Sequence, residues 1–421
     1  MLGALKTAGW ELSADPDGAD AVVVNTCGFI KDAREESMQA ILESLNLKEQ
    51  GRCRVVAAVG CLSQRYGPEL RRDLPKLDAV IGVNQTGRLP EVLSTALSGQ
   101  AADICEPPSA VWNENPCRAL ATPPWTAYLK ISDGCENRCA YCAIPNIRGA
   151  YRSRPLDYIL ADAIRLSENG VKEITLVAQD STCYGHDLQP PVTTADLLRR
   201  ICRTVGQDVR WIRLMYDYPA SITDELIHTI ASEDKVCKYL DVPFQHAHPD
   251  VLRRMHRRGS QDEYRKTIEK LRRACPDIAL RTTCMVGFPG ETDKEFDSLL
   301  QFVKDMEFDR LGAFLYSREE GTPADSYKPR VQRKVSKERY AVLMETQQAI
   351  SLRKNRSLIG KRLEILVEGC DESGAFGRSY RDAPEIDGIV RIEDYSGAAG
   401  VFVVAEIIDA NEYDLLAKTI F

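Results

Sequence analysis

Three cysteines, Cys135, Cys139 and Cys142, lie within eight residues of this 421-residue chain. They stand in the stretch ISDGCENRCAYCAIPNIRG with the spacing C-x3-C-x2-C, and the stretch contains no histidine and no fourth cysteine. An apolar segment at 125–131 directly precedes them and is typical of a β-strand. The fold must therefore present three thiols on one short loop at the end of a strand.

The number of thiols restricts the metal that this loop can hold. A structural zinc site takes four protein ligands, so zinc would need a further ligand from elsewhere in the chain. A [4Fe–4S] cluster takes one cysteine per iron, so three cysteines leave one iron open to another molecule. The spacing favours an iron–sulfur cluster with an open site. Zinc completed from elsewhere and cysteines without a metal are the alternatives.

Composition predicts a cytoplasmic protein without a membrane anchor. Hydrophobic residues make up 44% of the chain, enough for a sizeable core, and no apolar run reaches membrane-spanning length. The start, MLGALKTAGW, lacks the apolar core of a signal peptide. In a reducing compartment the 14 cysteines are expected to be metal ligands or free thiols. The net charge of −7 argues against indiscriminate nucleic-acid binding.

Alternating strands and helices predict an α/β protein. Residues 1–98 alternate on a small scale and predict a domain with a parallel sheet. Cys27 and Cys61 each follow a predicted strand of this sheet, at the carboxyl ends where ligands usually bind. Residues 99–124 are rich in proline and alanine and are interpreted as a linker. Six βα units in residues 125–326 predict an incomplete (β/α)6 barrel with the three-cysteine loop on its catalytic face.

The last hundred residues carry opposite charges on two predicted elements. Residues 327–362 predict one long helix with eleven lysines or arginines and two glutamates. Residues 363–421 contain five short strands between turns rich in Gly, Asp and Ser, which predicts a small closed barrel of the OB type. That segment holds thirteen Asp or Glu against four Lys or Arg, a net charge near −9.

Seven stretches resemble the radical SAM methylthiotransferases and occur in the order expected of that family. They are VVVNTCGFIKDAREESMQAI, AVGCL, GCENRCAYCAIPNIRGAYRSRP, VAQDSTCYG, DVPFQHAHPDVLRRMHRRG, MVGFPGET and YSREEGTPA. The resemblance covers essentially the whole chain, including a tail similar to a TRAM domain. It implies an N-terminal methylthiotransferase domain, a radical SAM core, a connecting basic helix and a TRAM-like domain within the boundaries given above.

The same resemblance implies the cofactors. Family members carry two [4Fe–4S] clusters and replace a C–H bond by C–S–CH3. The radical SAM cluster would lie on Cys135, Cys139 and Cys142, and an auxiliary cluster would take three N-terminal cysteines, two of which match Cys27 and Cys61. One S-adenosylmethionine (SAM) supplies the methyl group and a second supplies the radical, so no catalytic side chain is expected beyond the cluster ligands. An electron donor, such as a flavodoxin or ferredoxin, and a sulfur donor are implied partners.

The first of the three auxiliary cysteines has no counterpart in this sequence. In the family it follows the first strand of the domain, and MLGALKTAGW resembles the helix after that loop. Cys53 lies inside a predicted strand and is a poor substitute. A sheet that lacks its first strand would also leave the neighbouring strand with an unpaired edge. We expect a start segment upstream of the given residues, and a truncated or defective homologue is the alternative.

Polar residues at the strand ends are candidates for binding the cofactor. Gln179 and Asp180 end the second barrel strand, where they would face the SAM amino group or cap a helix. The GFPG turn lies against SAM in related folds, and it is also ordinary turn chemistry. The cofactor-binding candidates are Tyr141, Gln179, Asp180, Gly287, Gly290 and Glu291.

Three residues are candidates for binding the substrate. Arg148 and Arg154 follow the cysteine loop and would hold the substrate aspartate or the loop, or form salt bridges. His246 would line the substrate or lie in a solvated loop. Its spacing from His248 suits a metal, but no carboxylate spacing supports a metal site.

Two branches of the family differ in substrate. One modifies an aspartate β-carbon in ribosomal protein uS12, and the other modifies a tRNA adenosine beside the anticodon. The stretches NTCGFIKDAREES, VAQDSTCYG and GRSYRDAPEIDG resemble the uS12 branch. The acidic tail also suits a basic ribosomal protein, free or in the 30S subunit, better than it suits tRNA. The basic helix contacts RNA or is a solvated face. A non-catalytic RNA- or ribosome-binding protein with a structural metal is the alternative from another class.

Overall fold

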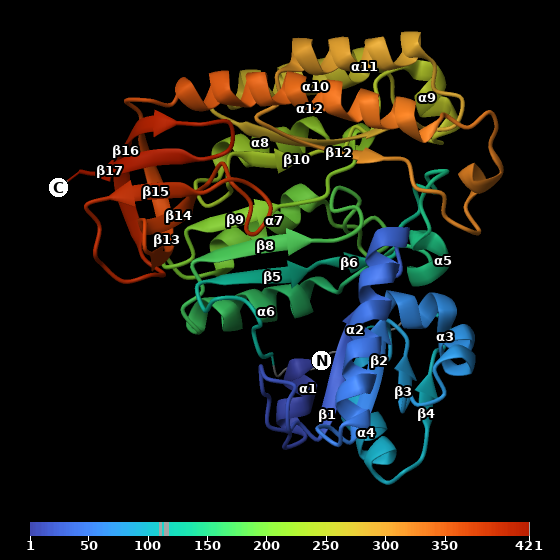
Figure 1. Cartoon of the computed structure of the whole chain (residues 1–421). Coiled ribbons are helices and arrows are strands. Elements are labelled where there is room, and N and C mark those ends of the chain that lie inside the picture. Colours follow the sequence, from blue (N-terminus) through green and yellow to red (C-terminus); the bar gives the residue numbers. More distant parts are fainter. Residues whose placement is uncertain (109–111, 113–117, 421) are drawn as a thin grey trace. The chain divides into compact units, whose positions relative to one another are not determined.

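The computed structural model describes residues 1–108, 112 and 118–420, and the chain divides into two compact units (Figure 1). Unit 1 consists of Met1–Ala121, Asp133–Arg152 and Ser317–Ser326, and unit 2 of Thr122–Ser132, Ser153–Tyr316 and Tyr327–Phe421. The three-cysteine loop therefore groups with the N-terminal sheet. Within the predicted linker at 99–124, residues 109–111 and 113–117 lie outside the described residues.

Unit 1 contains the predicted parallel sheet. Its strand order is β1-β2-β3-β4, and all of the pairs are parallel. The fourth strand falls in the predicted linker, where only three residues join the sheet. The strands are β1 (Ala21–Thr26), β2 (Val55–Gly60), β3 (Ala79–Ile81) and β4 (Ala102–Ile104). The other elements are α1 (Leu2–Thr7), α2 (Lys31–Glu49), α3 (Cys61–Asp73), η1 (Thr86–Arg88), α4 (Leu89–Leu97), α5 (Ile144–Arg148) and η3 (Pro323–Ser326).

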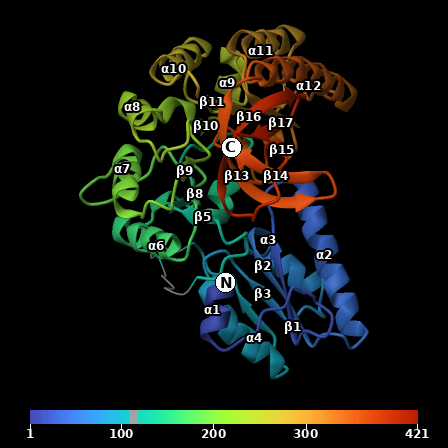
Figure 2. The same ribbon diagram turned by 90° about the vertical axis from the view of Figure 1, so that its left-hand side faces the viewer.

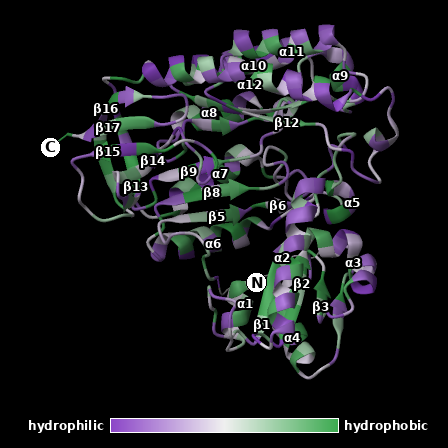
Figure 3. Cartoon of the chain, in the orientation of Figure 1, coloured by the Kyte–Doolittle hydropathy of each residue, from purple (hydrophilic) through white to green (hydrophobic). Residues whose placement is uncertain are grey.

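Strand β2 is buried on both faces, which explains its continuous apolar run VVAAVG. Val55, Ala57 and Val59 pack with residues of α1 and α4, whereas Val56 and Ala58 pack with residues of α2 and α3. The sheet is therefore the middle of three layers, and β1 and β2 are largely green in the hydropathy colouring of Figure 3.

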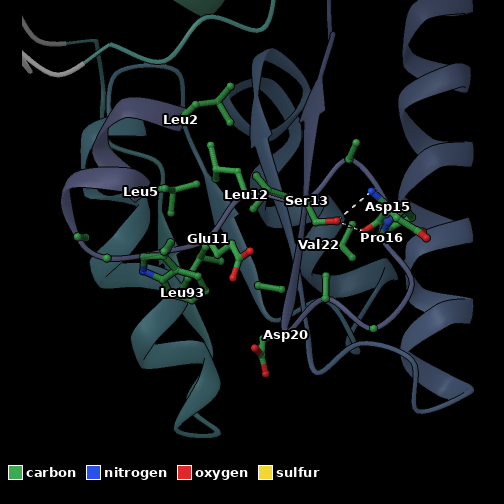
Figure 4. Close-up of a pocket in the computed structure, with 18 residues that line it drawn as sticks. Leu2, Leu5, Glu11, Leu12, Ser13, Asp15, Pro16, Asp20, Val22 and Leu93 are labelled. Atoms are coloured by element: carbon green, nitrogen blue, oxygen red, sulfur yellow. Dashed lines mark hydrogen bonds between the residues drawn. The ribbon is translucent and has the colours of Figure 1, made fainter.

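The edge strand β1 borders a cavity of 740 Å³ in unit 1 (Figure 4). Among the described residues, β1 pairs with β2 alone. The cavity lies beside α1, and apolar side chains such as Leu5, Leu12, Val22 and Leu93 line it. No cysteine borders it, so it is separate from the candidate ligands.

Unit 2 contains six parallel strands in chain order, as predicted. They form two sheets, β5-β8-β9 and β10-β11-β12, and an isolated parallel bridge between Ile212 and Val236 connects β9 to the segment before β10. The incomplete barrel is thus confirmed. The strands are β5 (Thr126–Lys130), β8 (Glu173–Val177), β9 (Trp211–Leu214), β10 (Tyr239–Asp241), β11 (Ala279–Val286) and β12 (Arg310–Leu315). The short strands β6 (Ser132–Asp133) and β7 (Arg152–Ser153) mark where the chain passes between the units.

Helices form an arc outside these strands (Figure 2). Their first turns are fixed by side chains that cap the backbone: Thr193 and Thr292 form complete capping boxes, and Thr223 and Ser260 also accept a backbone N–H. The helices are α6 (Leu156–Glu168), α7 (Thr194–Thr204), η2 (Pro219–Ser221), α8 (Asp224–Ser232), α9 (Pro249–Arg254), α10 (Gln261–Ala274) and α11 (Asp293–Met306).

The tail forms the predicted five-stranded closed barrel, with the order β13-β14-β15-β17-β16. The basic helix α12 (Arg333–Arg356) precedes it and is shorter than the predicted stretch of 327–362. Pro329 lies before the helix and Gly360, with φ +81°, lies after it. The strands are β13 (Arg362–Asp371), β14 (Gly374–Ser379), β15 (Val390–Glu393), β16 (Phe402–Ala410) and β17 (Leu415–Thr419). Among the described residues, no helix has the length and apolar character needed to span a bilayer.

The end of β14 and the segment after it lie at the amino-terminal ends of the larger barrel's strands. Three strands contact it through their first residues. Arg378 Nη2 donates to Glu173 Oε2 of β8 at 2.6 Å, and Tyr239 Oη of β10 donates to Asp387 Oδ2 at 2.7 Å. Arg310 Nη2 of β12 donates to an oxygen of Asp382 at 2.8 Å. Residues 378–387 therefore close the end of the barrel that is opposite its carboxyl face.

We expect Glu173→Gln to destabilise the chain by about 3–5 kcal/mol, because it leaves the buried Arg213 guanidinium without its counter-charge and leaves Arg378 with Glu368 as its remaining carboxylate. Arg213 Nε donates to Glu173 Oε1 at 2.8 Å, and the side chains of Glu173 and Arg213 are 0% exposed. Urea unfolding of the full chain measures the loss.

Glu35→Gln is the matched control, because the Lys31–Glu35 side chains are 63% and 65% exposed and such a pair contributes about 0–1 kcal/mol. Equal unfolding midpoints for the two variants would show that the buried network does not stabilise unit 2.

Candidate active site

Cys27 and Cys61 follow two neighbouring strands of unit 1 at the same edge of the sheet. The register of β1 and β2 pairs Thr26 with Gly60, so the next residue of each strand is a cysteine. Ser37 of α2 fixes the backbone of Cys27, because its hydroxyl accepts from Cys27 N at 2.9 Å and donates to Cys27 O at 3.2 Å. Parallel pairing thus brings together two thiols that stand 34 residues apart in the sequence.

Two glycines let these strand ends lie against each other. A Cβ on Gly28 would come within 2.7 Å of the carbonyl carbon and oxygen of Cys61. Gly60 has φ +115°, and a Cβ there would be 2.7 Å from Thr26 O. Any larger residue would push the two cysteine loops apart.

Cys53 lies away from this edge. It is 5% exposed, packs in the core on the side of α2, and its Sγ lies 3.9 Å from Ser44 O. Burial raises the pKa of the Cys53 thiol. A buried, protonated thiol of this kind is an apolar core residue.

The three-cysteine loop in unit 1 is fixed by its own backbone. Cys135 N donates to Gly149 O at 3.4 Å, and Cys142 N donates to Cys139 O at 3.0 Å. Asn137 Nδ2 lies 3.5 Å from Cys135 Sγ as a hydrogen-bond donor. All three cysteines line one cavity of 630 Å³. The loop thus presents three thiols to a common space.

Arg148, at the end of α5, connects this loop to Cys61. Its Nη1 donates to Asp133 Oδ1 at 3.1 Å and its Nη2 donates to Cys61 Sγ at 3.2 Å. Arg152 Nη2 lies 3.5 Å from the other oxygen of Asp133. Burial opposes the charge of Arg148, but Asp133 and Cys61 outweigh it and raise the pKa of the guanidinium. Ile147 packs against Cys61 in the same apolar cluster.

Glu319 joins the two N-terminal cysteine loops to the segment 317–326. Its side chain is 1% exposed, and its carboxylate accepts from Lys31 N at 3.0 Å, from Arg65 Nη1 at 3.1 Å and from Arg34. Arg65 also donates to Gly28 O at 2.9 Å, next to Cys27. Sequence reasoning named no residue of this segment as part of the site, although YSREEGTPA was among the motifs.

The same segment holds the three-cysteine loop. Ala324 N donates to Ala140 O at 2.8 Å, and Asn146 Nδ2 donates to Gly321 O at 3.0 Å. Unit 1 therefore brings the loops of all five predicted cysteine ligands into one hydrogen-bonded assembly.

Comparisons with known proteins agree with this organisation. Residues 129–303 match the model of the radical SAM superfamily, residues 359–420 the TRAM domain, and residues 1–82 the uncharacterized protein family UPF0004. The ribosomal protein uS12 methylthiotransferases RimO of Trichlorobacter lovleyi and Geobacter sulfurreducens are each 45% identical over the whole chain and 94% of their own length. The protein of the same name from Desulforudis audaxviator is 46% identical over the whole chain and 93% of its length. The chain belongs to the uS12 methylthiotransferase family.

A solved structure with the same fold is more distant. The radical SAM methyltransferase TsrM from Kitasatospora setae, with tryptophan and a SAM analogue bound, has a TM-score of 0.56 and 14% sequence identity, over 87% of this chain and 70% of that one. At this identity the likeness concerns the fold alone.

Membership of the uS12 methylthiotransferase family implies a [4Fe–4S] cluster and SAM. The donor set of unit 1 fits such a group: three thiols line one cavity with the spacing C-x3-C-x2-C.

The cofactor-binding candidates of unit 2 differ in the hydrogen bonds that they make. Asp180 Oδ1 accepts from Thr182 N at 3.1 Å and from Thr182 Oγ1 at 2.6 Å, so it caps its own turn. Gln179 Oε1 is buried and has no hydrogen-bond partner among the described residues. Gln179 thus presents the open acceptor that a ligand N–H requires.

Glu291 folds back onto the GFPG turn. Its carboxylate accepts from Gly287 N at 3.0 and 3.1 Å and from Arg339 Nη1 at 2.7 Å. Gly287 and Gly290 both have φ +75°, and a Cβ on Gly287 would be 2.2 Å from Ser336 Oγ of α12. Burial raises the pKa of Glu291. These residues fix the turn against α12.

His246 is fully buried in unit 2. Its Nδ1 accepts from His248 N at 3.0 Å, which leaves the proton on Nε2, 3.8 Å from Glu291 Oε2. Burial lowers the pKa of His246 to about 3, so the ring is neutral. Arg154 is 7% exposed and pairs with Asp162 at 2.7 Å. Tyr141, on the cysteine loop, is half-buried.

Two carboxylates do approach His248, contrary to the expectation from the sequence. The possible ligand atoms of His248, Asp250 and Glu295 lie within 4.8 Å of one another. However, Arg254 donates twice to Glu295 Oε1 at 3.0 Å, and Asp250 N donates to His248 Nδ1 at 3.2 Å. The group is therefore an arrangement of helix caps and an ion pair.

Sequence reasoning missed Asp217, which follows β9. It is 1% exposed, and neither carboxylate oxygen has a hydrogen-bond partner among the described residues. Burial, together with the charges of Asp241 and Asp180, raises its pKa well above the ordinary value. A polar residue three positions after a barrel strand was the available signal.

We expect Asp217→Asn to become more stabilising as the pH rises. In the unfolded chain an aspartate loses its proton at a pKa of about 3.9, whereas Asp217 in the folded chain keeps its proton to a higher pH. The free energy of unfolding of the parent chain therefore falls as the pH rises from about 3.9 to the raised pKa of Asp217. Asparagine does not ionise, so the variant should match the parent near pH 4 and exceed it at pH 8. Urea unfolding at several pH values measures the difference.

Asp208→Asn is the control, because the Asp208 side chain is 78% exposed. It should change the free energy of unfolding by less than about 0.5 kcal/mol at each pH. A pH-independent effect of Asp217→Asn would contradict a buried, protonated carboxyl group.

Proposed function

We propose that this chain replaces one hydrogen on the β-carbon of an aspartate in ribosomal protein uS12 by SCH3, in the cytoplasm. The observation that carries the proposal is the 45% identity over the whole chain to proteins named as uS12 methylthiotransferases. The assembly of five cysteines in unit 1 supports it, because the reaction needs a radical centre and a sulfur carrier close together.

In this proposal Cys135, Cys139 and Cys142 hold the radical SAM cluster, and Cys27 and Cys61 are ligands of an auxiliary cluster. When bound, the clusters and SAM supply the radical, the methyl group and the sulfur. The side chains of the chain bind and orient: Gln179, whose buried Oε1 has no partner among the described residues, accepts from the ligand. No side chain acts as a general base. A flavodoxin or ferredoxin as electron donor and a sulfur donor are the partners.

The surface of the tail barrel supports a basic protein substrate. Part of its acidity is internal, since Asp382 pairs with Arg310 and Asp387 accepts from Tyr239. Several acidic side chains nevertheless reach solvent: Asp371, Glu372, Glu385, Glu393, Asp394 and Asp409. A surface of this sign attracts a basic ribosomal protein and repels the phosphates of tRNA.

The test is a product assay on the anaerobically reconstituted full chain with SAM, a reductant, sulfide and either uS12 or unmodified tRNA. Mass spectrometry should find one hydrogen of uS12 replaced by SCH3. We expect Cys142→Ala to abolish both 5′-deoxyadenosine and product. Cys61→Ala should keep 5′-deoxyadenosine formation and lose the methylthiolated product.

Cys370→Ala is the control, because Cys370 is exposed at the end of β13 in unit 2. It should leave both readouts unchanged. Methylthiolated tRNA with unmodified uS12 would assign the chain to the other branch. Bound zinc without labile sulfide would contradict the proposed enzyme and support the alternative of a non-catalytic scaffold with a structural metal.

A further inference from the structure

Arg148 is held at a fixed place between two predicted cluster sites. Asp133, which is 2% exposed, binds it on one side, and Cys61 Sγ lies 3.2 Å from its Nη2 on the other. A guanidinium group has its donors in a rigid fork, so the bond to Asp133 sets the direction of the bond to sulfur. The contact is therefore a built feature of unit 1.

The surroundings of Cys61 strengthen this contact. Cys61 is 9% exposed and packs with Ala143 and Ile147, so little water competes for its sulfur. The Arg148 side chain is 23% exposed. Charge-assisted hydrogen bonds gain strength where water is excluded.

We propose that Arg148 is a positioning residue that donates a hydrogen bond to the Cys61 sulfur and thereby raises the reduction potential of the cluster that Cys61 ligates. This inference rests on the proposed function, in which Cys61 is a ligand of the auxiliary cluster. A donor and a positive charge beside a ligand sulfur stabilise the reduced, more negative cluster. The chain position of Arg148, six residues after Cys142, also makes it a direct link from the radical SAM loop to the sulfur carrier.

The substrate-binding role considered for Arg148 from the sequence stays a prediction beside this contact. Both ends of the Arg148 guanidinium already have partners, Asp133 and Cys61. These two bonds use two of the five N–H donors of the guanidinium group.

The experiment isolates the auxiliary cluster. In the full chain, Cys135, Cys139 and Cys142 are all replaced by alanine, and the protein is reconstituted anaerobically with iron and sulfide. A redox titration followed by electron paramagnetic resonance gives the midpoint potential. We expect Arg148→Gln in this background to shift the one-electron reduction equilibrium at least tenfold toward the oxidised form, a fall of about 59 mV.

Arg152→Gln is the matched control. Arg152 carries the same charge and lies 3.5 Å from the same carboxylate, but its other side-chain contacts are Asn84 Oδ1 and Arg148 O. It should leave the potential within a twofold change in the equilibrium. Equal falls in the two variants would mean a general charge effect and overturn the specific bond to Cys61.

The remaining outcomes separate this inference from the proposed function. A cluster that binds normally and keeps its potential in Arg148→Gln overturns the inference alone. Absence of iron and sulfide from the triple-alanine parent overturns the auxiliary cluster and the inference with it. Where Arg148→Gln lowers the iron content, the potential is read in Arg148→Lys, which keeps the charge and loses the two-sided fork. A fall is expected there too, and an unchanged potential overturns the inference.

Discussion

Each unit contains a joint of the same kind, which is a buried carboxylate bound by two arginines, and the packing of that unit depends on it. Glu173 binds Arg213 and Arg378 in unit 2, and Asp133 binds Arg148 and Arg152 in unit 1. A single buried ion pair seldom recovers its desolvation cost, but two guanidinium forks supply more donors to the carboxylate oxygens. Removal of one partner then leaves an uncompensated charge. Glu173 thereby fixes segments up to 205 residues apart in the sequence, whereas Asp133 fixes the two arginines that follow the three-cysteine loop.

In unit 1 these joints position the cysteines. Glu319 binds Arg65, which in turn binds Gly28 O beside Cys27. Asp133 directs Arg148 to the sulfur of Cys61. The β1–β2 register fixes the positions of the strand ends that precede Cys27 and Cys61. The ion pairs fix the positions of the cysteine loops in the same way, through rigid neighbouring side chains. A cofactor that carries the chemistry requires this rigidity more than it requires a general acid or base.

Local patterns predicted the elements well, because strand alternation, helix caps and cysteine spacing are properties of short segments. All six barrel strands and the five tail strands appear where they were expected. The partners of buried charges could not be predicted in the same way. Arg65 and Glu319 are 254 residues apart, and their contact exists only once the chain is folded. The hydrogen bonds of the Glu291 carboxylate to its own loop and to Arg339 are a further example, because Arg339 is 48 residues away.

Net charge along the sequence is also a poor guide to the charge that a partner meets. Two basic side chains of helix α12 form ion pairs within unit 2: Arg339 pairs with Glu291, and Lys354 lies 3.4 Å from Asp309. In the acidic tail, Asp382 likewise forms an ion pair with Arg310. Beyond these pairs, exposed acids remain around the tail barrel, whereas the exposed lysines and arginines of α12 lie in its first turns and again in its last turn.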